Sequence, residues 1–382
     1  MQARPPSLWP LLIKPMLYDT VSTGKLPVMR LSSGSPLDLR QRLHKLPKVD
    51  LHRHLEGSLR LETLAEIARE HGIDLPGYDI ERLRPYVQIT NDPPDFQRFL
   101  EKFQLLRRFY TTKEAVQRVA YEAVADAALD NVRYLELRFN PAALAHAQGF
   151  SFEEVTDWVI QAVNHAQVDY QIMARLICTI VRHENPKSAR QIVELALSRQ
   201  KYGIVGLDLA GDETIYPAAP LVSLFRHAAQ GGLGITIHAG EAGGPENVRE
   251  AIELLGAQRI GHGISCVEDS NVLMLVRDRQ VALEICPTSN LQTGAVEKFG
   301  YHPLRDLYLA GVRVTVNTDD PSISDTTLTD EYLVAVMGMN LTVKDLIAFN
   351  RNAIRASFLP PAERAQLEAQ LMAEFDARST DG

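Results

Sequence analysis

Two histidines separated by one residue, His52 and His54, stand at the end of an apolar run. Side chains alternate across a β-strand, so residues two positions apart point to the same side. Two imidazoles that face one point supply half of a nitrogen-rich metal site. A surface strand with two solvated histidines would show the same short pattern, so the pair alone leaves both interpretations open.

The ends of two later apolar runs supply the remaining ligand types of such a site. His238 ends one run and Asp319 follows another, so with His52 and His54 the chain offers three imidazoles and one carboxylate. This set suits Zn²⁺, or another borderline divalent ion such as Fe²⁺ or Co²⁺. An ion with an open coordination position would lower the pKa of bound water to about 7 and supply hydroxide at neutral pH.

Three further residues close to these ligands in sequence could move protons or contact a substrate. Glu241 follows His238 on the turn that leaves the strand, where it could exchange a proton beside the metal or cap the next helix. His262 has a glycine on each side, which permits close approach, and could orient and deprotonate the bound water. Asp320 follows Asp319, and neighbouring strand residues point to opposite faces, so one acid can bind metal while the other faces the substrate.

The elements that position these residues alternate along the chain from about residue 46. Short apolar runs cover residues 48–55, 132–139, 171–181, 203–209, 234–238, 259–264, 281–285 and 312–317. Segments of helical periodicity separate them, which predicts a parallel sheet, and this number of strands fits a closed (β/α)8 TIM-type barrel. An open doubly wound sheet is the alternative, but no G-x-G-x-x-G motif follows the first strand. Chemically capable residues follow nearly every run, as expected for an enzyme of the barrel type.

The connection after the first strand, residues 57–130, is longer than a barrel needs and predicts a helical insertion. Large apolar residues recur in it at helical spacing: Phe96, Phe99, Leu100, Phe103 and Leu106. A helix packed on the outside of the barrel would show this pattern. A lid over the catalytic mouth would show it too, because the loops after the strands lie on that face.

Bulk composition narrows the class of protein. The chain has 382 residues and a formal net charge of -8, without a dense stripe of lysine or arginine, which argues against a nucleic-acid partner. Three widely spaced cysteines and no long apolar run predict a cytoplasmic protein without a membrane span. Residues 1–38, rich in Pro, Ser and Gly, predict a flexible extension, with Met29 as an alternative start, before one domain over residues 39–382.

Together these motifs resemble the adenosine deaminase family of the metal-dependent amidohydrolase superfamily, from about residue 46 to the end. The motifs are K-V-D-L-H-R-H-L-E-G at 48–57, L-D-L-A-G-D-E at 207–213, H-A-G-E at 238–241, G-H-G at 261–263 and N-T-D-D-P at 317–321. The resemblance implies a (β/α)8 barrel and one Zn²⁺ per chain. Its implied ligands are His52, His54, His238 and Asp319.

The resemblance also implies a reaction, the hydrolytic deamination of adenosine and 2′-deoxyadenosine with release of ammonia. Glu241 would protonate the purine N1, zinc-activated hydroxide would attack C6, and His262 would assist. Asp320 would bond N7, and the N–H of Gly211 would contact N3. Further substrate-binding positions are implied at Phe96, Phe99, Leu100 and Phe103, which match an apolar gate helix, and at Ser289. The implied partner is a small purine nucleoside, without nucleic acid or membrane.

Glu56 departs from the family pattern, which commonly places Asp at this position to contact the ribose 5′-hydroxyl. Relatives that act on adenine, or on modified adenosines such as aminodeoxyfutalosine, often carry Glu there. The A-G-D-E sequence at 210–213 is more similar to the nucleoside enzymes, which favours adenosine and leaves adenine or a modified adenosine as the alternative. A catalytically silent metal-stabilised binding protein is a third hypothesis, disfavoured because Glu241 and His262 are both present.

Overall fold

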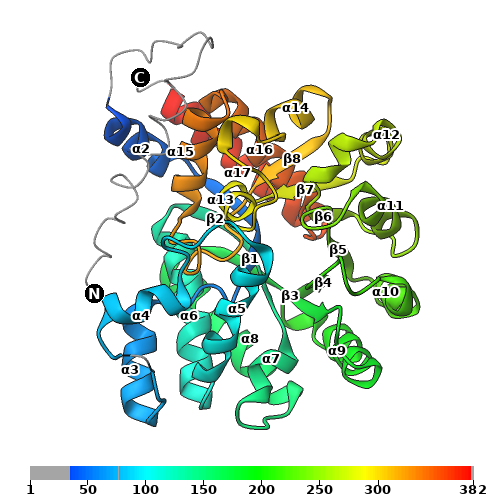
Figure 1. Ribbon diagram of the computed structural model, residues 1–382. Helices are drawn as coiled ribbons and strands as arrows, with labels where there is room; N and C mark the ends of the chain where they lie inside the picture. The colour runs from blue at the N-terminus through cyan, green and yellow to red at the C-terminus, as the bar shows by residue number, and fades with distance from the viewer. Residues whose placement is uncertain (1–34, 76, 380–382) are drawn as a thin grey trace.

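The computed structural model describes residues 35–75 and 77–379, and its centre is an eight-stranded parallel sheet (Figure 1). The strands are β1 (Lys48–His54), β2 (Val132–Phe139), β3 (Met173–Val181), β4 (Ile204–Ala210), β5 (Gly234–Ala239), β6 (Arg259–His262), β7 (Ala282–Ile285) and β8 (Arg313–Val316). Each strand pairs in parallel with the next one along the chain. Two backbone hydrogen bonds, Asp319 N to His52 O at 2.8 Å and His54 N to Asp319 O at 2.9 Å, join the segment after β8 to β1. The predicted (β/α)8 barrel is therefore confirmed.

Helices surround the sheet and cover its outer face (Figure 1). They are α2 (Pro36–Lys45), α3 (Leu61–His71), α4 (Ile80–Val87), α5 (Phe96–Leu106), α6 (Lys113–Leu129), α7 (Pro141–His146), α8 (Phe152–Tyr170), α9 (Pro186–Ser198), α10 (Val222–Gln230), α11 (Pro245–Glu253), α12 (Ser270–Asp278), α13 (Pro287–Gln292), α14 (Leu304–Leu309), α15 (Leu328–Gly338), α16 (Val343–Ala356) and α17 (Pro361–Ser379). The connection between β1 and β2 contains α3, α4, α5 and α6. Apolar strand residues such as Leu135 and Leu137 pack outward with these helices in one core.

Five strands are shorter than the apolar pattern indicates, and two of them, β3 and β6, are cut short by two residues at a turn. The segment at 171–181 becomes a strand only from Met173, because Gln171 ends α8 in the left-handed conformation with φ 52°. The segment at 259–264 stops at His262, where φ is 62°, and Gly263 follows with φ 70°. Positive φ breaks a strand, so both ends mark turns that apolarity alone does not reveal.

The interior of the barrel is unusually polar. On β2 the alternate residues Tyr134, Glu136 and Arg138 are fully buried, and Arg138 approaches Glu284 of β7 at 2.7 Å. The barrel interiors of this architecture are more often filled by branched apolar residues. Here pairs of oppositely charged side chains fill the barrel. Their charges act, in a low-dielectric interior, on any site at the carboxyl ends of the strands.

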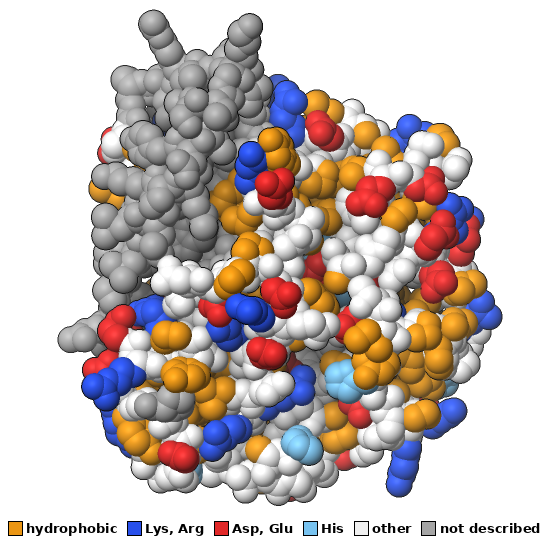
Figure 2. All heavy atoms as spheres, viewed as in Figure 1, with side chains coloured by type: hydrophobic (Ala, Val, Ile, Leu, Met, Phe, Trp, Pro, Cys, Tyr) orange, Lys and Arg blue, Asp and Glu red, His pale blue; other side chains and the backbone are white. Residues whose placement is uncertain are grey.

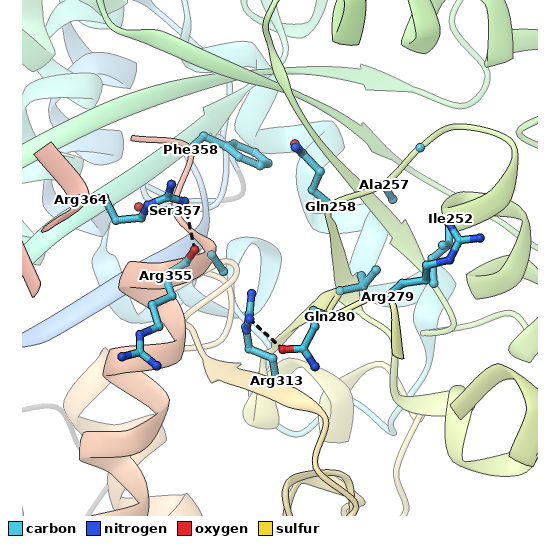
Figure 3. A pocket seen from close by; sticks show the side chains of 13 residues that line it. Ile252, Ala257, Gln258, Arg279, Gln280, Arg313, Arg355, Ser357, Phe358 and Arg364 are labelled. Atoms are coloured by element: carbon cyan, nitrogen blue, oxygen red, sulfur yellow. Dashed lines mark hydrogen bonds between the residues drawn. The ribbon is translucent and has the colours of Figure 1, made fainter. Parts of the chain in front are cut away.

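The amino end of the barrel is closed by Phe358, whose ring lies 3.6 Å from the Arg259 guanidinium carbon, measured to the ring centroid. A Cβ at Gly234 would overlap that ring, so this strand can pass Phe358 only as glycine. A cavity of about 370 Å³ beside Phe358 is lined by Arg279, Arg313 and Arg364 among others (Figure 3). It lies beside the starts of β6, β7 and β8, away from the histidines at the other ends of the strands.

Most of the predicted extension, residues 1–34, lies outside the described residues, and so does Met29. Residues 36–38 begin α2, which Ser35 caps through a reciprocal pair of hydrogen bonds with Asp38. Over the described ranges, no helix is long and apolar enough to cross a membrane. On the face shown in Figure 2, Lys and Arg side chains are scattered among acidic ones, apart from the area that grey atoms cover.

Candidate metal centre and active site

The four predicted metal ligands converge at the carboxyl end of the barrel. The Nε2 atoms of His54 and His238 lie 3.2 Å apart, and Asp319 Oδ1 lies 3.1 Å from His52 Nε2 and 3.4 Å from His54 Nε2. One donor atom from each of the four residues lies within 4.8 Å of every other. Ligands at about 2.1 Å from zinc in a tetrahedron are roughly 3.4 Å from one another, so these spacings fit one zinc-sized ion.

Buried carboxylates behind two of the histidines fix which ring nitrogen faces the centre. Glu284 accepts a hydrogen bond from His52 Nδ1 at 2.8 Å, and Asp208 accepts one from His238 Nδ1 at 3.0 Å. Because a carboxylate only accepts, Nδ1 carries the proton and Nε2 offers its lone pair to the centre. Burial, His238 and His52 hold the pKa of His54 well below its usual range, which favours the neutral imidazole that binds metals.

Two arginines keep these supporting carboxylates charged. Burial alone would raise the pKa of Glu284, but Arg138 and Arg259 hold it well below its usual range. The pKa of Asp208 is likewise lowered, against the effect of its burial, by His238 and Arg138. An ionised carboxylate strengthens a histidine as a metal ligand, so the interior charges act directly on the centre.

Asp319 reaches the centre from an uncommon backbone conformation, with φ 59°. Left-handed backbone costs a residue other than glycine energy, and such strain concentrates at functional sites. A second group of candidate ligands among the described residues joins His52 and Asp319 to His262 and Cys286. The Cys286 thiol, however, donates to the Glu284 backbone oxygen at 3.6 Å, and burial raises its pKa well above the usual range. We therefore assign the centre to the group of three histidines and Asp319.

Glu241 faces the centre on a loop that Glu213 holds in place. The Glu213 carboxylate accepts the backbone N–H groups of Gly240, Glu241, Ala242 and Gly243 at 2.8–2.9 Å. Burial, followed by the charges of Asp319 and Glu213, raises the pKa of Glu241 well above its usual range. A buried carboxylic acid that keeps its proton near neutral pH can donate that proton to a substrate. The Glu213 contacts are a positioning feature that sequence reasoning missed.

His262 lies beside Glu241. Its Nε2 is 3.4 Å from Glu241 Oε2 and 3.9 Å from Asp319 Oδ2, and its ring centroid is 5.0 Å from that of His52. Its other ring nitrogen, Nδ1, lies 3.0 Å from the side-chain nitrogen of Asn290. The structure thus brings His262 together with the ligands and the acid, and adds Asn290 behind it.

Two buried acids next to the metal ligands present oxygens that have no protein hydrogen-bond partner in the described part of the chain. They are Asp320 Oδ1 and Glu56 Oε2, while Glu56 Oε1 accepts the Asn140 N–H at 2.7 Å. Burial, then Asp319 and Glu56, raises the pKa of Asp320 well above its usual range, and burial raises that of Glu56 to about 7. Buried polar atoms without partners are costly, so these oxygens indicate a place for a polar ligand.

Gly57 lets the first loop approach these acids, since a Cβ there would overlap Asp320 Oδ1. Gly211, the predicted N3 contact, adopts φ 97° at the end of β4. Ser289 is buried in α13, and its hydroxyl has no hydrogen-bond partner within residues 35–75 and 77–379. Gly211 and Ser289 both follow the carboxyl end of a strand, β4 and β7, and their contacts with a substrate stay predictions.

Helix α5 lies at the mouth of the site. Phe96 and Glu241 line one cavity of about 650 Å³, and the loop before α5 bonds the α13 segment through Asp95 N and Gln292 O at 3.0 Å. Phe99 is buried and stacks edge-on against Phe103 at 6.5 Å between ring centroids. Leu100 and Phe103 are half-buried. A lid formed by α5 stays a prediction, which the cavity shared by Phe96 and Glu241 supports.

The barrel and its ligand set define the class of metal-dependent amidohydrolases. The sequence model of the family described as adenosine deaminase matches residues 47–374. The chain is 39% identical over 327 residues to an adenosine deaminase from Clostridium botulinum, a match that covers 85% of this chain and 97% of the relative. The chain belongs to the adenosine deaminase family, and it is therefore a hydrolase of C–N bonds.

Solved structures of similar proteins share this fold, and one of them is an adenine deaminase. An adenine deaminase from Arthrobacter aurescens is 30% identical, with a TM-score of 0.80 over 87% of this chain and 99% of that one. A zinc-bound amidohydrolase from Burkholderia ambifaria is 25% identical, with a TM-score of 0.83 over 93% of this chain and 96% of that one. Both solved structures share the fold of this chain, and the adenine deaminase carries a different substrate in its name from the adenosine deaminase relative.

Proposed function

We propose that this protein is a zinc-dependent adenosine deaminase that converts adenosine and 2′-deoxyadenosine into their inosine counterparts and ammonia. The observation that carries the proposal is the pair of buried acids, Glu241 and Asp320, both close enough to the ligand Asp319 to interact with its charge. Burial and the charge of Asp319 raise the pKa of each well above its usual range, a shift that favours the protonated acid. The purine ring nitrogens N1 and N7 are both acceptors, so their recognition needs two such donors.

His52, His54, His238 and Asp319 would hold one zinc ion. When bound, the metal supplies a water nucleophile at neutral pH and balances its negative charge. Glu241 places a proton at N1, which makes the neighbouring C6 more electrophilic, and Asp320 donates to N7 and fixes the plane of the ring. Helix α5 excludes water over the mouth, which strengthens each of these interactions.

Glu56 is the residue that would distinguish a nucleoside from the free base. Its partnerless Oε2 and its pKa of about 7 suit a hydrogen bond to a hydroxyl group, as on the sugar of a nucleoside. The 39% identity to an adenosine deaminase supports the nucleoside, and the 30% identity to an adenine deaminase keeps the free base as the second candidate. A modified adenosine such as aminodeoxyfutalosine is tested with them.

The experiment is ammonia release from adenosine, 2′-deoxyadenosine, adenine and aminodeoxyfutalosine by the purified protein. We expect the highest kcat/KM for the first two, loss of activity after chelation and recovery with one equivalent of Zn²⁺. The same rates after complete removal of metal would contradict the zinc mechanism. A higher kcat/KM for adenine or aminodeoxyfutalosine would replace adenosine as the substrate and leave the chemistry in place. Glu56→Asp should change the ranking among the substrates if Glu56 contacts the sugar.

A further inference from the structure

A chain of three buried side chains runs from His262 away from the metal centre. Asn290 Nδ2 lies 3.0 Å from His262 Nδ1, and Asn290 Oδ1 lies 3.2 Å from His302 Nε2. His302 Nδ1 in turn receives the backbone N–H of Leu304 at 3.1 Å. His262, Asn290 and His302 are exposed by 1%, 0% and 5%, so water does not compete strongly for these bonds.

The backbone N–H of Leu304 decides the direction of every bond in this chain. A backbone N–H only donates, so His302 Nδ1 is an acceptor and carries no proton. Burial lowers the pKa of His302 to about 3, so the ring is neutral and its single proton is on Nε2. His302 Nε2 therefore donates, and the atom of Asn290 that faces it is the carbonyl oxygen, as the distances place it.

The amide nitrogen of Asn290 then faces His262 as a donor, which leaves the lone pair of His262 on Nδ1. We infer that Asn290 and His302 are positioning residues that hold the proton of His262 on Nε2, so that His262 acts as a hydrogen-bond donor in the reaction. The sequence suggested that His262 deprotonates the water, a task that requires a lone pair on Nε2. The hydrogen bonds of the structure favour the opposite role.

The surroundings of His262 Nε2 indicate which group its N–H stabilises. It faces Glu241 Oε2 at 3.4 Å and Asp319 Oδ2 at 3.9 Å, on the side of the metal ligands. An N–H fixed at this point stabilises negative charge that develops on the attacking oxygen, in the manner of an oxyanion-hole donor. This role rests on the proposed deamination, whereas the position of the proton on His262 does not.

The proton is located directly by ¹⁵N NMR of the metal-free protein and of the zinc-loaded protein, with histidine as the labelled residue. His262→Gln identifies the His262 signals by their disappearance. We expect the Nε2–H tautomer at His262 in both forms at pH 7. The Nδ1–H tautomer in the metal-free protein would overturn the inference whatever the substrate is, so its failure is separate from that of the proposed function.

Asn290→Asp reverses the hydrogen bond to His262 Nδ1, because a carboxylate accepts from both His262 and His302. We expect the proton of His262 to move to Nδ1, or the ring to become doubly protonated, and kcat to fall about 10²-fold or more with a smaller change in KM. Thr288→Val is the matched control on the same helix, since the Thr288 side chain adjoins Glu331 and takes no part in the chain from His262 to His302. It should leave the tautomer and kcat unchanged. Wild-type tautomer and kcat in Asn290→Asp would refute the inference, and the wild-type spectrum decides alone if that variant does not fold.

Discussion

The two ends of the barrel interior use buried polar groups in opposite ways. At the carboxyl end, Glu56 Oε2 and Asp320 Oδ1 are buried close to the metal ligands in sequence and have no protein hydrogen-bond partner in the described residues. At the amino end, Arg259 Nη2 and Glu136 Oε2 make no hydrogen bond of regular geometry in the described ranges either, but they form an ion pair at 2.6 Å, and the guanidinium group packs on Phe358. Unpartnered buried groups lower the stability of the fold, whereas paired ones hold its shape. The contrast indicates that one end is built for a ligand and the other for rigidity.

Glu284 connects the two ends. It accepts hydrogen bonds from Arg138 and Arg259 within the barrel and from His52 at the metal centre. The rigid framework therefore also orients a metal ligand, and the comparison predicts different readouts for substitutions at each end. Changes at the carboxyl end should lower catalysis more than stability, and changes at the amino end should do the reverse.

The largest effect is expected at the carboxyl end, from Glu241→Gln. Glutamine keeps the shape of the side chain but cannot give its proton to N1, so kcat should fall by ~10²–10⁴-fold. The midpoint of thermal unfolding should not decrease, because the substitution removes a buried acid. Glu253→Gln, an exposed change on α11, is the control and should retain wild-type kcat. A loss of less than threefold for Glu241→Gln, roughly within the scatter of such measurements, would exclude Glu241 as the acid.

A smaller effect, on stability, is expected at the amino end from Phe358→Ala. Removal of a ring packed in the base of the barrel should cost about 3 kcal/mol of unfolding free energy, as measured by urea denaturation. Phe358→Leu keeps most of the apolar volume and should cost about 1 kcal/mol. The kcat of the folded Phe358→Ala protein should stay within a few-fold of wild type. A large loss of kcat without loss of stability would show that the two ends are not separable in this way.

The fold and the convergence of the four candidate ligands could be predicted from the sequence because each leaves a local signal. His52 and His54 share one side of a strand by their spacing, and His238 and Asp319 end or follow apolar runs. The strand limits were less accurate where a turn depends on one positive φ, as at Gln171 and His262. Such a turn is set by contacts distant in sequence, and apolar periodicity contains no information on them.

The residues that support the ligands could not be found in the same way. Glu284 is the single acid in an otherwise apolar strand, and that isolated charge was the only available signal. Asn290 and His302 are ordinary residues in sequence and become a chain only because α13 and the segment before α14 meet behind β6. Asp208 and Glu213 lay inside a motif whose carboxylates had no assigned partner. Their functions depend on pairwise geometry, which spacing along the chain does not encode.

The smallest effect concerns the lid, which one polar contact joins to the loop after β4. Gln97 Nε2 of α5 donates to Asp212 Oδ2 at 2.5 Å. Gln97→Leu removes this bond, which is worth about 1 kcal/mol on a partly exposed surface, so the closed lid should be up to about fivefold less favoured. We expect KM for adenosine to rise by that factor with kcat unchanged or slightly higher, because product leaves through the same opening. Gln104→Leu, on an exposed turn of the same helix, should change neither constant, and equal effects of the two variants would show that surface polarity matters instead of the contact.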